Sequence, residues 1–267
     1  MPEGDILRRT AAALDATLTG QVVTRTDLRW PSAAGTSFDG AAVLGTHAYG
    51  KHLFTRFDDG RTLHTHLRME GYWFVHPTGA PGARARGAFV RAVIGTAAHT
   101  AVGHRLGMLD VVPTRAEGDL VAHLGPDVLA DDFPERGLPE ALGRAAARAG
   151  TPVAEVLLDQ TVAAGIGTIY LAESLFTRRV WPWTPVEATD LATVLMVARA
   201  LMQRSVAAPT PTATVDTTHG RTTLVHGRAG GPCRRCGTPV AVGSAGVPPR
   251  ERPVFWCPTC QARPGAD

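Results

Sequence analysis

All four cysteines of the chain lie near its C-terminal end, in two Cys-x2-Cys pairs. Cys233 and Cys236 form the first pair, and twenty residues separate it from Cys257 and Cys260. Each pair can direct two sulfurs at one ion from a tight turn, and two such turns complete a tetrahedral four-sulfur site. Zinc suits a closed site of this kind best, and the alternatives are a rubredoxin-like iron site or two disulfides. We therefore expect one structural Zn2+, because so small a module lacks the core to fold without its ion.

Residues 247–256, which lie between the two pairs, predict a hairpin with Arg250 and Arg252 near its tip. An arginine on a rigid, metal-clamped tip can bind a phosphate through both arms of its guanidinium. Residues 221–267 hold seven basic and two acidic side chains, which favours a polyanionic partner. A merely solvated tip is the alternative for each arginine.

The 267 residues are 44% hydrophobic and 19% charged, so the chain can bury a core and should not be disordered. The length suggests one large domain or two to three small ones. The sequence has no run of eighteen uncharged apolar residues, so we expect no transmembrane helix and no membrane partner. The acidic start, residues 1–5, has the features of neither a secretory signal nor a transit peptide. We therefore expect a cytoplasmic protein.

The basic residues number 27, and all of them except Lys51 are arginine. Such a bias usually follows genome composition, because arginine codons are rich in G and C. A lysine kept against this bias suggests a need for a compact ammonium with an adjustable pKa, which arginine does not supply. Chance survival at the surface is the alternative. Lys51 is therefore a candidate functional residue.

The first part of the chain has the pattern of one helix followed by strands. Apolar residues at 7, 11, 14 and 18 form one face of a helix over residues 3–18, which Gly20 ends. Strand patterns then fill residues 21–117, with a hairpin about Asp58-Asp59-Gly60 and further strands at 88–95 and 109–113. Residues 77–87 are rich in Gly, Pro, Ala and Arg and predict a mobile loop.

The second part of the chain has a helical pattern broken by Gly and Pro. Helices are expected over residues 139–149, 152–160, 168–179 and 187–206, and residues 207–223 are irregular. We therefore predict a multidomain α+β chain. Its parts are a β-rich domain at 1–117, an acidic linker at 118–138, a helical domain at 139–220 and a metal module at 221–267.

Two of these helices meet at a Gly-x-Gly turn formed by Gly165, Ile166 and Gly167. Thr168 follows and is a candidate N-cap for the second helix. The free N–H groups at such a helix start would bind an anion, and a phosphate at the turn would fit contact with a DNA backbone. An ordinary capping turn is the equally open alternative.

The order and identity of several segments resemble the formamidopyrimidine-DNA glycosylase/endonuclease VIII family of bifunctional DNA glycosylases. The matching segments are MPEGD at 1–5, GKHLF at 50–54, HLRMEGYW at 66–73, HRLG at 104–107, LGPDVLADDF at 124–133, LLDQTVAAGIGTIYLAESLF at 157–176, GRAGGPCRRCG at 227–237 and RPVFWCPTCQ at 252–261. They extend over nearly the whole chain, and its two ends are most similar to the actinobacterial endonuclease VIII-like branch. The resemblance implies an N-terminal catalytic domain built from a helix and a β-sandwich, a helix–two-turn–helix domain and a zinc finger.

The resemblance also implies the chemistry of the N-terminus. Removal of Met1 would expose the secondary amine of Pro2, whose pKa is low enough for part of it to be neutral and nucleophilic. That amine would attack the sugar C1′, expel a damaged base and form an iminium, which permits strand cleavage by β/δ elimination. Glu3 would serve as the acid/base carboxylate. Without the resemblance, Pro2 and Glu3 would be interpreted as an ordinary helix start.

The remaining site residues are also implied by the resemblance. Lys51 corresponds to a lysine that contacts a phosphate and assists elimination, and Arg252 to a zinc-finger arginine that grips the flanking phosphate. Met69 falls where the family fills the gap left by a flipped base, although a core methionine is the alternative. The other residues expected to contact DNA are Arg68, Arg105, Gly167, Thr168 and Arg250. The implied partner is damaged DNA, bound by a monomer in the bacterial cytoplasm, at the nucleoid.

Thr168 departs from the family, which has Asn at this position. Threonine keeps a hydroxyl but loses the reach of the amide, so DNA backbone binding would be weaker or the lesion would be seated differently. The leading hypothesis is therefore a glycosylase/lyase for damaged bases, with oxidised pyrimidines favoured by the branch. The alternative is a specialised or catalytically reduced damaged-DNA-binding protein of the same fold. A further alternative, a zinc-ribbon RNA-binding module, would account only for the C-terminal segment that carries the four cysteines.

Overall fold

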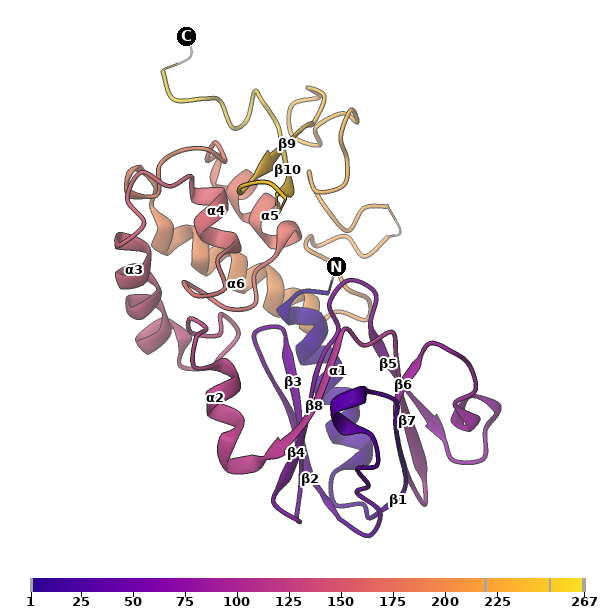
Figure 1. The fold of residues 1–267 in the computed structure, drawn as a ribbon. Helices are drawn as coiled ribbons and strands as arrows, with labels where there is room; N and C mark the ends of the chain where they lie inside the picture. The colour runs from indigo at the N-terminus through magenta and orange to yellow at the C-terminus, as the bar shows by residue number, and fades with distance from the viewer. Residues whose placement is uncertain (1, 219, 250, 266–267) are drawn as a thin grey trace. The chain divides into compact units, whose positions relative to one another are not determined.

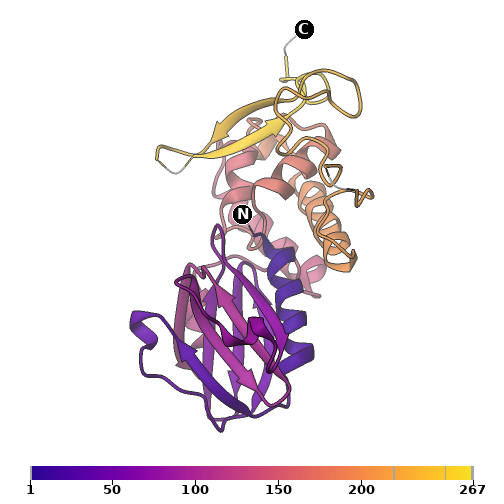
Figure 2. The ribbon, with the colours of Figure 1, turned by 90° about the vertical axis from the view of Figure 1, so that its right-hand side faces the viewer.

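The chain folds as two units, seen in a computed structural model that describes residues 2–218, 220–249 and 251–265. The first unit is Met1–His123 and the second is Leu124–Asp267. Figures 1 and 2 show helices with two sheets in the first unit, and helices with one small hairpin in the second. Among the described residues, no helix combines the length and apolar character needed to cross a membrane.

The first unit contains α1 (Gly4–Leu18), β1 (Val23–Leu28), η1 (Pro31–Ala33), β2 (Val43–Tyr49), β3 (His52–Phe57), β4 (Arg61–His66), β5 (Tyr72–Pro77), η2 (Pro81–Arg84), β6 (Val90–Thr96), β7 (His99–His104), β8 (Met108–Pro113), η3 (Thr114–Ala116) and α2 (Glu117–Val121). The second unit contains η4 (Phe133–Gly137), α3 (Leu138–Ala146), α4 (Val153–Leu158), α5 (Thr168–Arg178), η5 (Val186–Ala188), α6 (Leu191–Ala207), β9 (Ala241–Ala245) and β10 (Arg252–Trp256).

The strands of the first unit form two antiparallel four-stranded sheets, ordered β1-β6-β7-β5 and β2-β3-β4-β8. Alternate residues of both sheets, such as Ile94 and Leu63, enter one core together with the apolar face of α1. That face is the one expected from periodicity, since Leu7, Leu14 and Leu18 are all buried. The predicted hairpin is also confirmed, because β3 pairs with β4 across the turn at 58–60. This arrangement is the expected helix-plus-sandwich fold.

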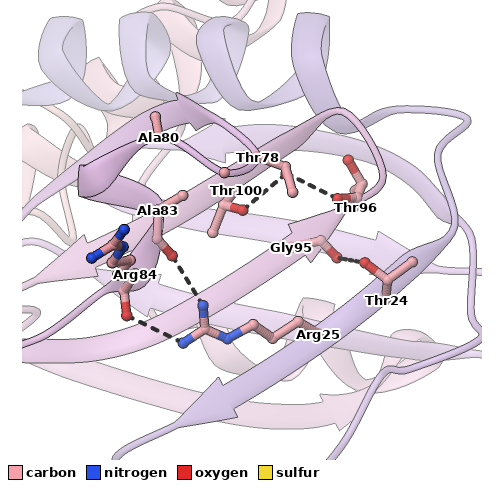
Figure 3. A pocket seen from close by; sticks show the side chains of 10 residues that line it. Thr24, Arg25, Thr78, Ala80, Ala83, Arg84, Gly95, Thr96 and Thr100 are labelled. Carbon is pink, nitrogen blue, oxygen red and sulfur yellow. Dashed lines mark hydrogen bonds between the residues drawn. The ribbon is translucent and has the colours of Figure 1, made fainter.

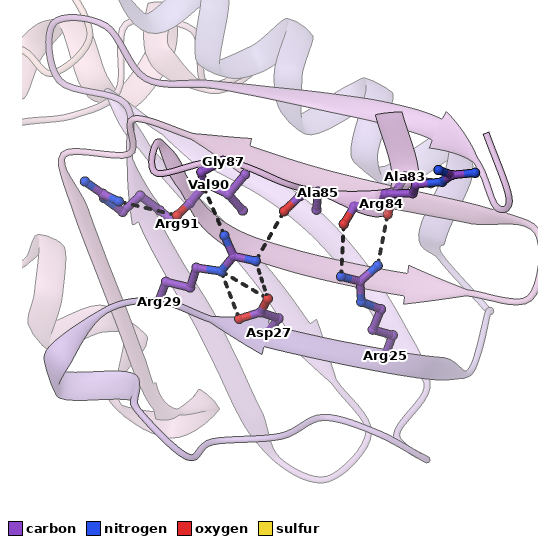
Figure 4. A network of polar contacts seen from close by, with 9 residues as sticks. All are labelled: Arg25, Asp27, Arg29, Ala83, Arg84, Ala85, Gly87, Val90 and Arg91. Carbon is purple, nitrogen blue, oxygen red and sulfur yellow. Dashed lines mark hydrogen bonds and ion pairs between the residues drawn. The ribbon is translucent and has the colours of Figure 1, made fainter. Parts of the chain in front are cut away.

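Residues 77–87 are more regular than the expected mobile loop. The segment contains the short helix η2, and Ala83 and Ala85 are buried. Arg25 donates to the carbonyl of Ala83 over 2.9 Å, and Arg29 donates to the carbonyl of Ala85 over 3.2 Å (Figure 4). Guanidinium groups from β1 and from the residue that follows it thus satisfy backbone acceptors that a mobile loop would leave to water.

A cavity of about 360 Å³ lies beside this segment (Figure 3). Its polar wall is bonded internally: Thr78 pairs with Thr100 over 3.1 Å, and the Thr78 hydroxyl donates to the Thr96 carbonyl over 3.0 Å. Arg25, which reaches into the wall, is already engaged with the backbone of η2. None of the site residues predicted from the sequence lines this cavity.

The second unit has a separate core that joins its helices to the cysteine module. Leu171 and Phe176 of α5 and Val194 of α6 are buried in it, together with Val254 of β10 and Cys257. Part of the segment expected to be a linker also contributes, since Val128, Leu129 and Phe133 are buried in the same core. The domain boundaries at 117, 138 and 220 stay predictions.

Candidate active site and metal centre

The N-terminal candidate residues lie at the start of α1. Glu3 is the N-cap residue of this helix and is only 1% exposed, and its backbone carbonyl accepts the N–H groups of Ile6 and Leu7. Pro2 precedes it and is partly exposed. The helix start therefore fixes both residues on a rigid element, as a reactive terminus requires. Met1, whose removal the chemistry needs, lies outside the described residues.

Lys51 occupies the two-residue turn between β2 and β3, whose flanking residues Tyr49 and His52 are paired. Gly50, the first residue of the turn, has φ 54°, which a glycine adopts without strain. Such a Gly-x turn fixes the register of a tight hairpin. The ammonium of Lys51 is therefore displayed from the rigid end of a sheet rather than from a loose loop.

A group of histidines borders this turn, and the sequence interpretation missed it. The Nδ1 atom of His52 lies 2.8 Å from Nε2 of His64, and the His66 ring meets His52 edge to face at 5.0 Å. These side chains alternate along β3 and β4, so they share the sheet face opposite the core. The period-two spacing of histidine at 64 and 66 was the available signal in the sequence.

The histidines beside Lys51 are held neutral. Burial, reinforced by the neighbouring His66, lowers the pKa of His52 to about 3. Burial, followed by the charges of Arg68 and Lys51, lowers the pKa of His66 to about 4. Lys51 is thus within electrostatic reach of His66. At neutral pH the cluster adds no positive charge that would compete with Lys51 for an anion.

Arg68, Met69 and Arg105 lie on two adjoining turns of the first unit. Arg68 and Arg105 both have left-handed backbones, with φ of 52° and 49°. The turns are joined because the Gly107 N–H donates to the carbonyl of His66 over 2.9 Å. A Cβ on Gly107 would come within 2.2 Å of the Arg68 side chain, so glycine is required there. Met69 is 61% exposed, which excludes the core methionine considered as its alternative.

In the second unit, the Gly-x-Gly turn precedes α5 as expected, but Thr168 is not its N-cap. The helix begins at Thr168, and Gly167 is the N-cap residue with an extended backbone. The reason is the amide of Gln160, which accepts from the N–H of Gly165 over 3.0 Å and donates to the carbonyl of Ile166 over 2.9 Å. These bonds bring the chain into α5 one residue earlier than the capping pattern suggested. Thr168 is buried in the first turn.

The four cysteines converge as their spacing predicted. Their sulfur atoms all lie within 4.8 Å of one another, and none is in a disulfide. The Sγ atoms of Cys233 and Cys260 are 4.0 Å apart, and those of Cys236 and Cys257 are 3.4 Å apart. Four bonds of about 2.3 Å to one ion require sulfurs about 3.8 Å apart, so the cluster fits a tetrahedral metal. The group can therefore hold a metal ion.

The cysteine module is anchored to α5 by a buried carboxylate. Glu173 accepts the backbone N–H groups of Leu224, Val225 and His226 over 2.7–2.9 Å. It is fully buried, and burial raises its pKa while the three N–H groups act against that shift. The segment that leads into Cys233 is therefore fixed to the helix. Sequence reasoning did not single out Glu173, because nothing local distinguishes it from a solvated helical glutamate.

A hairpin does lie between the cysteine pairs, but it begins earlier than the expected 247–256, because its first strand is β9 (Ala241–Ala245) and its second is β10 (Arg252–Trp256). Arg252 opens β10, where it pairs with Ala245 and is exposed. Arg250 lies outside the described residues. The candidates are thus distributed over both units: the nucleophile, acid/base and lysine candidates occur in the first, and the glycine turn, Arg252 and the cysteines occur in the second.

Comparisons with known proteins agree with this arrangement. A family model for the formamidopyrimidine-DNA glycosylase N-terminal domain matches residues 1–111, and one for the formamidopyrimidine-DNA glycosylase H2TH domain matches residues 124–216. A probable endonuclease 8 2 of Streptomyces coelicolor is 43% identical over 99% of this chain and 95% of its own length. A DNA-(apurinic or apyrimidinic site) lyase Nei2 of Mycolicibacterium smegmatis is 40% identical over 98% of this chain and 99% of its own.

Solved structures extend the likeness to the fold. Formamidopyrimidine-DNA glycosylase of Lactococcus lactis, crystallised with DNA that contains an abasic site, superposes with a TM-score of 0.80 at 20% identity. The match covers 98% of this chain and 100% of the other. A MutM complex with DNA that contains carbocyclic 8-oxo-G gives a TM-score of 0.81.

Proposed function

Since the chain belongs to the formamidopyrimidine-DNA glycosylase/endonuclease VIII family, we propose that Pro2, Glu3 and Lys51 form the catalytic group of its first unit. The protein is a bifunctional DNA glycosylase and abasic-site lyase of base excision repair. It releases a damaged base and then cleaves the strand at the sugar left behind.

The reaction begins once Met1 has been removed and Pro2 carries a free secondary amine. The neutral amine attacks C1′, the N-glycosidic bond breaks, and the base leaves with a proton. Opening of the sugar gives an iminium between the Pro2 nitrogen and C1′. The iminium acidifies the C2′ proton, whose loss expels the 3′ phosphate, and a second elimination expels the 5′ phosphate. Hydrolysis of the iminium frees the amine.

Glu3 and Lys51 move the protons in this scheme. Glu3 is buried at the helix N-cap directly after the nucleophile, so its carboxyl stays next to the reacting sugar and can protonate it during ring opening. Lys51 extends from a rigid turn beside histidines that are neutral at pH 7. A single ammonium there binds a phosphate and can donate or accept a proton during elimination.

The second unit binds the DNA backbone in this proposal. The N–H groups at Gly167 and Thr168 face a phosphate at the start of α5, where the helix dipole favours an anion. Arg252, exposed on β10, grips a phosphate beside the lesion, and Arg250 assists it. We propose zinc as the ion of the cysteine cluster, because four thiolates form a closed tetrahedral site. The ion supplies structure rather than a reactive water.

Oxidised pyrimidines are the proposed substrates, because the most similar relatives include several endonuclease 8 proteins of actinobacteria. We propose that the enzyme acts as a monomer on the chromosome, in the bacterial cytoplasm. Thr168, which replaces the family's asparagine, adjusts backbone affinity rather than removing catalysis.

The full-length match that starts at the first residues of the chain is the observation that carries this proposal. Borohydride added during reaction with an abasic-site duplex should reduce the iminium and trap a covalent protein–DNA adduct. An N-terminal tag that blocks Pro2 should abolish trapping, and the same tag at the C-terminus should not. Intact mass should show the loss of Met1 from the active protein. Equal trapping by both tagged forms would refute the role of Pro2.

A further inference from the structure

The cavity beside the segment 77–87 lies on the outer face of the sheet β1-β6-β7-β5 (Figure 3). Its floor is one row of the sheet, in which Gly95 of β6 pairs with Arg25 of β1 and with Thr100 of β7. The preceding residue of β6, Ile94, is buried in the core on the other side of the sheet. The cavity is therefore a feature of the surface and not a packing defect of the core.

Gly95 is the reason that this part of the sheet is hollow. A Cβ on Gly95 would lie 3.1 Å from the Cβ of Arg25 and 3.5 Å from Oγ1 of Thr100, so a side chain there would take up space between these two residues. A glycine in a strand gives up packing and costs more entropy on folding than other residues, and it often marks the close approach of a ligand. The volume of about 360 Å³ is within the range of small-molecule sites.

The threonine hydroxyl groups of the wall are fixed by bonds to the sheet and to one another. Thr24 donates to the carbonyl of Gly95 over 3.4 Å, and Thr78 donates to the carbonyl of Thr96 over 3.0 Å. The 3.1 Å contact between Thr78 and Thr100 must then use the hydrogen of Thr100. These hydroxyl groups therefore have lone pairs, but no hydrogens, left for a ligand, so this part of the wall accepts hydrogen bonds.

Two arginines give the other part of the wall its charge. Arg25 donates from Nη1 to the carbonyl of Ala83 over 2.9 Å and from Nη2 to the carbonyl of Arg84 over 3.5 Å, which fixes its guanidinium and leaves further N–H groups for a ligand. The exposed Arg84 side chain also lines the cavity. Among the described lining residues none is acidic, and the carboxylate of Asp27 on the same strand is paired with Arg29 over 2.7 Å (Figure 4). The local field therefore attracts an anion.

The cavity is separate from the residues proposed for the reaction. Thr78 follows the last residue of β5, whereas the turn that carries Arg68 and Met69 precedes its first residue. At about 3.4 Å for each residue, the length of β5 puts about 20 Å between the two. A ligand in the cavity is therefore additional to the DNA on which the enzyme acts.

We propose that the cavity formed by Arg25, Arg84 and Thr100 over Gly95 binds a small phosphorylated polyol of the sugar-phosphate class. The phosphate binds the two guanidinium groups, whose N–H groups match its oxygen atoms. The hydroxyl groups of the polyol donate to the threonine oxygens, which have no hydrogen of their own to offer. A DNA backbone fits this wall less well, because its phosphates are diesters and its sugars carry no free hydroxyl groups within the strand. Binding would hold the segment 77–87 on the sheet.

Hydrogen–deuterium exchange of the full, metal-loaded chain locates the ligand. The probe is sorbitol 6-phosphate, which has no aldehyde that Pro2 could attack. At about ten times its Kd, amides of residues 77–87 that exchange by local opening should exchange about tenfold more slowly. Sorbitol alone, and inorganic phosphate at the same ionic strength and concentration, should slow them less than twofold, because each uses only one part of the wall.

Calorimetric titration of variants tests the named side chains. Arg84→Gln should weaken binding of sorbitol 6-phosphate about tenfold, and Thr100→Val about fivefold, as expected for a charged and a neutral hydrogen bond. Both variants keep the bonds from Arg25 to the segment 77–87. Arg115→Gln is the matched control, because Arg115 is an exposed arginine of the same unit that does not line the cavity, and it should change the affinity less than twofold.

Three results would overturn the proposal. The first is equal affinity of Arg84→Gln and Arg115→Gln, or slower exchange confined to segments outside the cavity. The second is equal slowing by inorganic phosphate, which would show that an anion alone binds. The third is protection of residues 77–87 by an abasic-site duplex, which would assign the cavity to DNA. If Arg84→Gln or Thr100→Val fails to fold, exchange of the native chain still decides. None of these measurements uses the lyase reaction, so their outcome is independent of the proposed function.

Discussion

Replacement of Glu173 by glutamine should loosen the cysteine module from the helices. One carboxylate oxygen, Oε2, accepts from Leu224, and the other, Oε1, accepts from Val225 and His226. A glutamine has the same shape but carries one amide nitrogen in place of an oxygen. The least damaging orientation directs this nitrogen at Leu224 and so keeps two of the three bonds.

The energetic effect follows from this geometry. Glu173→Gln leaves one backbone N–H unsatisfied and adds a buried amide group that faces a donor. Each unsatisfied buried group costs about 1–3 kcal/mol. Some relaxation is available, so we expect a loss of about 2–4 kcal/mol in the free energy of unfolding of the second unit. At roughly 2–4 °C for each kcal/mol, its Tm should fall by roughly 5–15 °C.

The assay is thermal unfolding of the full, metal-loaded chain, together with the rate at which a colorimetric chelator removes the ion. Glu173→Gln should unfold earlier and release its metal faster. Glu140→Gln is the control, because Glu140 forms an exposed pair with Arg144, which contributes about 0.3–0.5 kcal/mol. If the two variants unfolded within a degree of each other and lost metal equally fast, Glu173 would not anchor the module.

Three further outcomes are expected. Lys51→Arg should keep most of the DNA affinity but slow single-turnover cleavage at least about tenfold, roughly 1.4 kcal/mol of barrier, whereas Lys51→Ala should lose both; cleavage by Lys51→Arg at the native rate would reduce the lysine to a phosphate anchor. Elemental analysis should find one zinc per chain, and freshly purified protein that lacks zinc would contradict this prediction. Chelation should unfold the cysteine module and weaken DNA binding, while circular dichroism should show that the sheets of the first unit stay intact. The pKa values of His52 and His66, about 3 and about 4, lie below the ordinary 6.5, so the unfolded chain binds more protons than the folded chain between these values, and the first unit should lose stability as pH falls from 6.5 towards 4. Denaturant midpoints that do not change with pH over this window, or that change as steeply in His52→Gln as in the native chain, would show that the two histidines do not cause the effect.

The elements that could be predicted from the sequence are those with local signals. The helix at 4–18 follows from apolar residues in a 3.6-residue period, and the β3–β4 hairpin follows from its Asp-Gly turn. The cysteine cluster follows from spacing alone. Pro2 and Glu3 became candidates only through the resemblance of the chain to the glycosylase family, because their local sequence pattern indicates an ordinary helix start.

Features that depend on long-range packing could not be predicted. Gln160 shapes the turn before α5 through bonds to Gly165 and Ile166, so Thr168 was wrongly interpreted as the cap. The strand order that places Phe89 next to Arg105 is set by pairing between segments that are distant in the chain. Burial of His64 likewise depends on what covers the outer face of its sheet, which no period within the strand reveals.

The shared core of the second unit has a consequence for how the protein is made. Val254 and Cys257 close that core around α5 and α6, and they follow both helices in the chain, so they leave the ribosome after them. The buried core residues of the first unit end at Leu109, so all of them are synthesised well before these two residues. A newly made chain therefore carries a finished first unit beside helices whose apolar faces stay open until the terminal cysteines meet their ion. If the ion is scarce, these open faces would attract chaperones and proteases, so we expect metal supply to limit how much enzyme accumulates.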